Sequence, residues 1–216
     1  MRTALLGLLA LLVGGAPPTP ASPGLPWVFN LDNVKAVEAG DPLLTFAMAA
    51  DPEPSCDDLT SSGYALTANV TGTGANETIL ASFAHGVMVY GREGELLAAT
   101  PGFPCSGSAD GIDVLAVGTA FGVPTIAIVA TTGGRREQLS WLGLYRVGLN
   151  GRLEALFAGA IEQREDGIVR RGSVTFLPGA LLVRDPMGGV GFWTFDQVSG
   201  VYIPRGGFAG AEPPHN

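Results

Sequence analysis

The chain is poor in the side chains from which most enzyme and metal sites are built. Its 216 residues include two histidines and two cysteines, and only 15% of them are charged. So few histidines and cysteines do not make up the usual zinc ligand sets. The CxxC, Gly-x-Ser-x-Gly and P-loop motifs are also missing. We therefore predict no catalytic, cofactor-binding or metal-binding residues, although this leaves open whether the protein is an enzyme.

Two remaining possibilities for chemistry rest on His85 and on the acidic residues. Ala84-His85-Gly86 is a compact connection between two expected strands, where a polar side chain is expected to be exposed. The sequences around Asp57-Asp58 and Asp110–Asp113 do not match the Asp-x-Asp-x-Asp-Gly pattern of a calcium loop. The twenty acidic residues offer many carboxylate pairs, so a hydrolase that uses one such pair stays open.

The chain lacks a concentrated basic face. Its formal net charge is −8 at pH 7, whereas nucleic-acid backbones are bound by clustered lysines and arginines. We therefore expect no nucleic-acid partner and interpret the acidity as a feature that favours solubility.

Long hydrophobic runs are missing except near the N-terminus. Arg2 precedes an apolar stretch, Ala4–Val13, which is shorter than the roughly 20 residues that a membrane-spanning helix needs. Small residues and prolines follow, as in a secretory signal peptide, and we expect cleavage after Ala21. An uncleaved membrane anchor is the alternative. Once residues 1–21 are removed, we expect no membrane span and a secreted, periplasmic or cell-envelope location.

The two cysteines suit an exported chain in an oxidising compartment. Cys56 and Cys105 both lie in surroundings rich in proline, serine, aspartate or glycine. We predict that they form a structural disulfide between two loops, worth roughly 4 kcal/mol on the chain-entropy model.

Glycine and proline are abundant, with 32 and 16 residues, and they favour tight turns. Apolar runs of strand length lie between the expected turns, and Tyr64–Thr71 alternates with a period of two residues, as a half-buried strand does. No stretch has convincing helical periodicity, although residues 152–163 come nearest. We predict an all-β protein with an extended leader over residues 22–42, a single β-repeat domain over 43–205 and a flexible tail over 206–216.

The strand signals recur about every fifty residues, a spacing typical of β-propeller blades. Apolar runs open at Thr78, Thr125 and Val174, and each unit closes on a Gly-x-apolar sequence. The closing glycines are Gly94, Gly151 and Gly200. We predict propeller-like repeats of antiparallel sheets, with room for up to four blades, and a β-sandwich as the alternative.

One unit resembles a blade of the FG-GAP/VCBS type of exported β-propeller. Thr78–Ala81, Gly86–Tyr90 and Gly94–Leu97 follow that family's order of strand, hairpin and strand, and Gly111–Gly118 is a second similar piece. The resemblance covers about half of the mature chain and implies a module for adhesion or ligand contact outside the cytoplasm. The acidic calcium loop of that family is absent here, so its metal binding does not carry over.

A candidate ligand-binding surface consists of Arg135, Arg136 and Trp141, because arginine and tryptophan often anchor interfaces. The alternative is a solvated turn followed by a core tryptophan. Two sequences that begin at Asn69 and Asn76 fit the N-glycosylation pattern, and whether they are glycosylated stays open.

Three functions are compatible with these observations. The leading hypothesis is an exported, non-catalytic β-repeat module that binds a protein or a glycan at the cell envelope or outside the cell. The second is a secreted hydrolase that uses paired carboxylates, with Asp110 and Asp113 as the residues to test. The third is a structural assembly component whose free sheet edges join neighbouring molecules.

Overall fold

The computed structural model describes residues 35–37, 63–120, 123–148, 150–177 and 179–205. Within these residues the chain forms fourteen β-strands and no α-helix, and the strands make three antiparallel sheets. The prediction of an all-β protein is therefore confirmed. The described residues contain no helix that is long and apolar enough to cross a bilayer.

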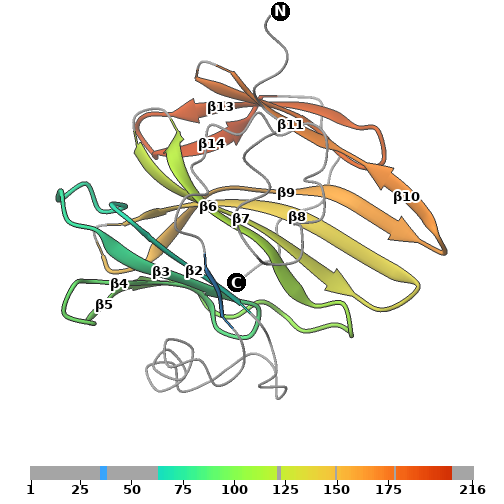
Figure 1. Cartoon of the computed structure of the whole chain (residues 1–216). Helices are drawn as coiled ribbons and strands as arrows, with labels where there is room; N and C mark the ends of the chain where they lie inside the picture. The colour runs from blue at the N-terminus through green and yellow to red at the C-terminus, as the bar shows by residue number, and fades with distance from the viewer. Residues whose placement is uncertain (1–34, 38–62, 121–122, 149, 178, 206–216) are drawn as a thin grey trace, which may run out of the picture.

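Each sheet is a meander in which strands that follow one another in the sequence lie side by side (Figure 1). The first sheet contains β1 (Lys35–Val37), β2 (Gly63–Ala68), β3 (Glu77–Ser82), β4 (Gly86–Tyr90) and β5 (Leu96–Ala99). The central sheet contains β6 (Gly111–Ala120), β7 (Val123–Gly133), β8 (Glu137–Val147), β9 (Leu153–Glu165) and β10 (Ile168–Arg171). The third sheet contains β11 (Ser173–Leu177), β12 (Ala180–Arg184), β13 (Val190–Asp196) and β14 (Val201–Pro204).

The central sheet lies between the other two and is apolar on both faces (Figure 1). On β7, Ile126 and Ile128 pack toward the first sheet, whereas Ala127 and Val129 pack toward the third sheet. This follows from the two-residue period of a strand, which sends successive side chains to opposite faces. Continuous apolar runs in the sequence thus become strands that are buried on both sides.

The same pattern holds for the hairpin of β3 and β4 in the first sheet. Ile79 and Val89 form a cross-strand pair that faces the central sheet, and Leu80 pairs with Met88 on the opposite face. All four side chains are buried. This hairpin is therefore part of the most thoroughly buried segment of the described chain.

The closing glycines of the sequence repeat occupy equivalent turns. Gly94, Gly151 and Gly200 have φ angles of 84°, 72° and 69°, and each lies just before the last or next-to-last strand of its sheet. Side chains other than glycine rarely adopt such angles. The repeated Gly-x-apolar pattern therefore reflects a repeated turn conformation.

The openings of the repeat are not equivalent, which corrects the predicted unit. Thr78 lies in the third strand of the first sheet, Thr125 in the second strand of the central sheet and Val174 in the first strand of the third sheet. Units of equal length in residues can contain different numbers of strands. The third sheet fits an additional hairpin into the same length because its strands are shorter than those of the central sheet.

Several predicted boundaries also change. Val123 and Pro124, which were expected in a turn, belong to β7 and pair with Ala120 and Thr119. The stretch nearest to a helical pattern lies within β9, which continues to Glu165. The predicted signal peptide, leader, first strand over residues 43–50 and tail lie wholly or mostly outside the described residues.

Candidate functional site

The central sheet is longer than the third sheet that packs on it. Strand β8 has eleven residues and the longest strand of the third sheet, β13, has seven. At about 3.3 Å per residue, these lengths correspond to roughly 36 Å and 23 Å. The covered middle of β8 presents buried Leu142 and Leu144 to the third sheet. By strand alternation, Ser140 and Arg146 lie on the same face beyond this apolar middle.

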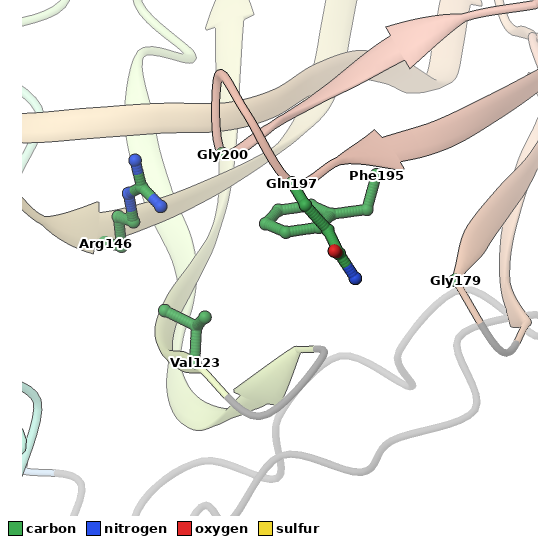
Figure 2. A pocket seen from close by; sticks show the side chains of 6 residues that line it. All are labelled: Val123, Arg146, Gly179, Phe195, Gln197 and Gly200. Carbon is green, nitrogen blue, oxygen red and sulfur yellow. The ribbon is translucent and has the colours of Figure 1, made fainter.

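A pocket of about 310 Å³ lies at the Arg146 end, between the central sheet and the turns of the third sheet. Its lining residues come from β7, β8 and the third sheet, as Figure 2 shows. They are Val123, Arg146, Gly179, Phe195, Gln197 and Gly200. Among the described residues, the lining therefore combines one cation, one aromatic ring and one amide. A volume near 300 Å³ is at the lower end for small-ligand sites.

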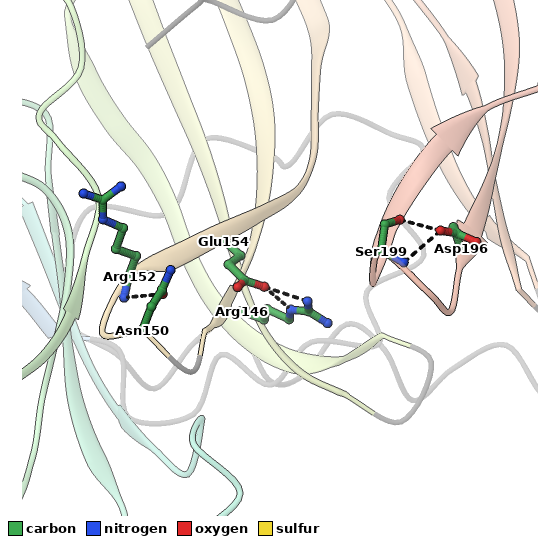
Figure 3. A network of polar contacts seen from close by, with 6 residues as sticks. All are labelled: Arg146, Asn150, Arg152, Glu154, Asp196 and Ser199. Atoms are coloured by element: carbon green, nitrogen blue, oxygen red, sulfur yellow. Dashed lines mark hydrogen bonds and ion pairs between the residues drawn. The ribbon is translucent and has the colours of Figure 1, made fainter.

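Arg146 is held in place by its cross-strand partner Glu154 (Figure 3). Its Nε and Nη2 atoms lie 2.7 Å and 2.6 Å from the same carboxylate oxygen, Oε2 of Glu154. About a quarter of the Arg146 side chain is exposed. The ion pair orients the guanidinium group, and its remaining N–H groups are directed toward the third sheet.

Gly200 allows the guanidinium group to lie against the turn between β13 and β14. A Cβ atom at this position would collide with Nη1 and Nη2 of Arg146. Gly200 is also buried and has a φ of 69°. The backbone conformation thus favours glycine here, and any larger residue would also displace the Arg146 guanidinium group.

The turn that carries Gln197 and Gly200 is fixed by Asp196. Its carboxylate accepts hydrogen bonds from the Ser199 hydroxyl at 2.6 Å and the Ser199 backbone N–H at 2.8 Å. These bonds hold the pKa of Asp196 below its ordinary value. Between β8 and β9, Asn150 Oδ1 accepts a hydrogen bond from the backbone N–H of Arg152 at 3.1 Å, as Figure 3 shows. Local hydrogen bonds therefore order the turn between β13 and β14, and another joins Asn150 to Arg152 at the start of β9.

The pocket has the chemistry of a binding site. Its lining residues in the described part of the chain include no acid, thiol, hydroxyl or histidine. The neighbouring carboxylate of Glu154 is already engaged by Arg146. These residues can therefore donate hydrogen bonds and provide an aromatic surface, but they supply no nucleophile and no general base.

Comparisons of the chain with protein-family models, curated proteins and solved structures gave no match. Function is therefore inferred from the chemistry of the chain's own residues. No residue of this pocket was predicted as a site from the sequence. Gly200 is the lining residue that the sequence singles out, as a closing glycine of the repeat and not as a site residue.

The predicted surface of Arg135, Arg136 and Trp141 is not brought together. Both arginines are exposed in the turn between β7 and β8. Trp141 lies five residues after Arg136, and five residues of extended strand span roughly 16 Å. It is half-buried and packs on Phe103 with ring centroids 5.1 Å apart. The alternative, a solvated turn followed by a core tryptophan, describes these residues better.

The expectation that His85 is exposed is wrong. Its side chain is buried, and Nδ1 lies 3.0 Å from the Ser82 hydroxyl. The hairpin tip is covered by residues 100–103, because Phe103 N–H bonds to the Phe83 carbonyl at 2.9 Å and Val87 N–H bonds to the Thr100 hydroxyl at 2.9 Å. A polar residue in a turn is exposed only when no other segment packs over that turn.

Asp110 holds a loop together. Its carboxylate accepts hydrogen bonds from the backbone N–H groups of Ser106, Gly107 and Gly133 at 2.6, 3.0 and 2.9 Å. Thr132 donates a further bond at 3.0 Å. Burial opposes ionisation, but these bonds outweigh it and lower the pKa of Asp110. An acid that stays ionised in this way is unsuited to donate a proton in catalysis.

The predicted disulfide stays a prediction, because Cys56 lies outside the described residues. Cys105 is in the exposed loop between β5 and β6. Without reductant, the intact mass of the exported protein is expected to be two hydrogens below that of the reduced chain. Alkylation of both thiols in the unreduced protein would contradict the pairing.

Proposed function

We propose that the protein is an exported, non-catalytic β-repeat module that binds a glycan through the pocket at Arg146, at the cell envelope or outside the cell. The observation that carries the proposal is the oriented guanidinium group beside Phe195 and Gln197. Sugars present hydroxyl oxygens that accept hydrogen bonds from guanidinium and amide groups, and they present C–H faces that pack on aromatic rings.

The dimensions of the pocket favour a glycan over a protein ligand. A specific protein interface buries about 800 Å² on each partner, whereas a pocket of about 310 Å³ accepts a small unit of a larger molecule. The guanidinium N–H groups that Glu154 does not engage also favour a sugar that bears a carboxylate, since guanidinium groups bind carboxylates with good geometry. A protein partner is the other outcome of the test.

The proposal is tested by screening the mature protein on a glycan array that includes uronic acid sugars, followed by calorimetry with the glycans retained. Gln197→Ala removes an exposed amide and is expected to weaken binding about 2–10-fold, as loss of a neutral hydrogen bond implies. Arg146→Gln removes a charged donor and is expected to weaken binding about 10–100-fold.

The matched control is Arg92→Gln, which changes an exposed arginine in the turn before β5. It is expected to leave binding unchanged. Equal effects of the variants at residues 92 and 146 would indicate a general charge effect and contradict the pocket. Retention of no glycan on the array, with capture of a protein partner through the same residues, would replace the glycan by a protein ligand.

The proposal includes propeller-like packing of the repeats, with a β-sandwich as the alternative. Its support is that each sheet is a sequential antiparallel meander and that sheets pack face to face. Both architectures place turns at the ends of the sheets, where the pocket lies.

The hydrolase alternative is favoured by a different observation. Desolvation raises the pKa of Asp113, and Glu162 lies close enough on the central sheet for its charge to raise that pKa as well. Release of product from the retained glycans, lost in Asp113→Asn, would support it. Turnover that persists in Asp113→Asn would contradict a catalytic role for Asp113.

A further inference from the structure

A row of polar side chains crosses the central sheet at the end opposite to the pocket. Asp113 on β6 accepts a hydrogen bond from Thr131 on β7, with 2.5 Å between Oδ2 and Oγ1. Thr131 Oγ1 lies 2.6 Å from Ser140 Oγ on β8. Ser140 pairs in register with Glu162 on β9, and Glu162 binds Arg171 on β10 at 3.0 Å. All five strands therefore contribute to this polar row.

The row depends on an irregularity in β6. The pairing of β6 with β7 shifts between Ile112 and Val114, so Asp113 is left without a partner in the ladder. Such a bulge redirects a side chain. The bulge places the Asp113 carboxylate within hydrogen-bond distance of the Thr131 hydroxyl. In the sheet, Thr131 pairs with Gly111 on one side and with Ser140 on the other.

Counting protons fixes the direction of the hydrogen bonds. An ionised carboxylate only accepts, and each hydroxyl has a single proton to donate. While Asp113 is ionised, Thr131 must donate to Asp113 and Ser140 must donate to Thr131. The Ser140 hydroxyl then offers only its lone pairs toward Glu162, and a carboxylate cannot donate to them. Accordingly, the hydrogen bonds of the described residues include none between the side chains of Ser140 and Glu162.

We propose that the polar row is a proton-binding switch, in which a proton on Asp113 reverses the chain of hydroxyl bonds and turns Ser140 from an acceptor into a donor. Protonated Asp113 donates to Thr131, Thr131 donates to Ser140, and the Ser140 proton becomes available to Glu162 or to a ligand above the sheet. The heavy atoms need not move. A change at β6 is thereby passed across two strands to the surface of β8.

The groups around Asp113 support this assignment. The Asp113 side chain is exposed to solvent on one side. The protein packed around its carboxylate still raises the pKa of Asp113 by desolvation, the bond from Thr131 opposes the rise, and the charge of Glu162 adds to it. On β2, which packs against β6, burial and the charge of Asp113 raise the pKa of Tyr64. Glu162 itself is balanced by Arg171 at 3.0 Å and Arg164 at 3.5 Å.

Other charged groups on neighbouring elements are engaged elsewhere. Glu77 on β3 binds the loop over residues 70–73, and Asp110 binds its own loop. Because the pKa of Asp113 is raised in the folded state, the folded protein takes up this proton at a higher pH than the unfolded chain does. Protonation of Asp113 therefore stabilises the folded state as the pH falls, and the reversal does not itself cause acid unfolding.

Nuclear magnetic resonance can follow the switch through the ¹³C shifts of the Asp113 and Glu162 carboxyls and the Ser140 Cβ during a pH titration. The Ser140 signal is expected to move with the midpoint of Asp113. Thr131→Val interrupts the hydroxyl chain without a change in shape and is expected to abolish this transition at Ser140. Thr175→Val, on the outer side of the third sheet, is the control and should leave it intact.

A second variant covers the case in which Thr131→Val fails to fold. Asp113→Asn cannot gain a proton, and its amide can present either its oxygen or its N–H₂ group to Thr131, so the transition at Ser140 is expected to disappear. The proposal is overturned if Ser140 does not follow Asp113 in the unmodified protein, if the coupling persists in Thr131→Val, or if Ser140 still shows the transition in Asp113→Asn.

Discussion

Phe83→Ala is expected to lower the free energy of unfolding by about 3–5 kcal/mol, the usual cost of removing a buried aromatic ring. Phe83 directly follows β3 and is 2% exposed. Its ring centroid lies 5.5 Å from that of Phe103, and Phe103 lies 5.1 Å from Trp141 on the central sheet. The substitution would leave a cavity where the first and central sheets meet, and urea unfolding measures the loss.

Phe192→Ala is the matched control, because Phe192 is 39% exposed on the outer face of the third sheet. The same atoms are removed without opening a cavity, so a loss below about 1 kcal/mol is expected. Equal losses for the two variants would show that the ring at residue 83 does not join the two sheets. A change in the denaturant slope would indicate a change in compactness instead.

The strands could be predicted from the sequence because their signals are local. Alternation over Tyr64–Thr71 predicts a strand, and the structure contains β2 over Gly63–Ala68. The sequence Asn150-Gly151 is typical of a hairpin turn, and it joins β8 and β9. Turn chemistry and a two-residue period involve neighbours in the sequence only. Strand boundaries were less accurate where an apolar run continued past a proline, as at Pro124.

The candidate site could not be predicted in this way, since it depends on packing between sheets. Arg146 is joined to Glu154 by strand register and meets Gly200 only because the third sheet folds over the central one. Asp113 and Glu162 are brought near one another by three successive strand pairings. In contrast, Arg135, Arg136 and Trp141 are close in sequence, yet the strand extends between them and keeps them apart.

Glu77 shows the same limit at the level of one residue. In the sequence it is the middle of an Asn-x-Thr pattern and the start of a strand. In the structure the residue is 3% exposed, and its carboxylate closes the loop between β2 and β3. It accepts hydrogen bonds from the Val70 backbone N–H at 2.7 Å and the Thr71 hydroxyl at 2.8 Å. Only the folded loop shows that this acid is structural.

Glu77→Ala is therefore expected to lower the free energy of unfolding by about 2–3 kcal/mol, because the buried N–H of Val70 is left without an acceptor. Glu77→Gln keeps a carbonyl oxygen for that N–H and is expected to cost less. Glu137→Ala, at an exposed position at the start of β8, controls for the loss of one negative charge and should change stability by less than about 0.5 kcal/mol.

Hydrogen exchange separates the local effect from the global one. Loss of the Glu77 carboxylate is expected to speed exchange at the Val70 and Thr71 amides by more than the global loss of stability accounts for, since these two donors lose their acceptor directly. Protection at Leu142 and Leu144, in the core between the central and third sheets, should fall only by the global amount. Unchanged protection at Val70 in Glu77→Ala would show that another group accepts this N–H, and that the loop does not depend on the buried acid.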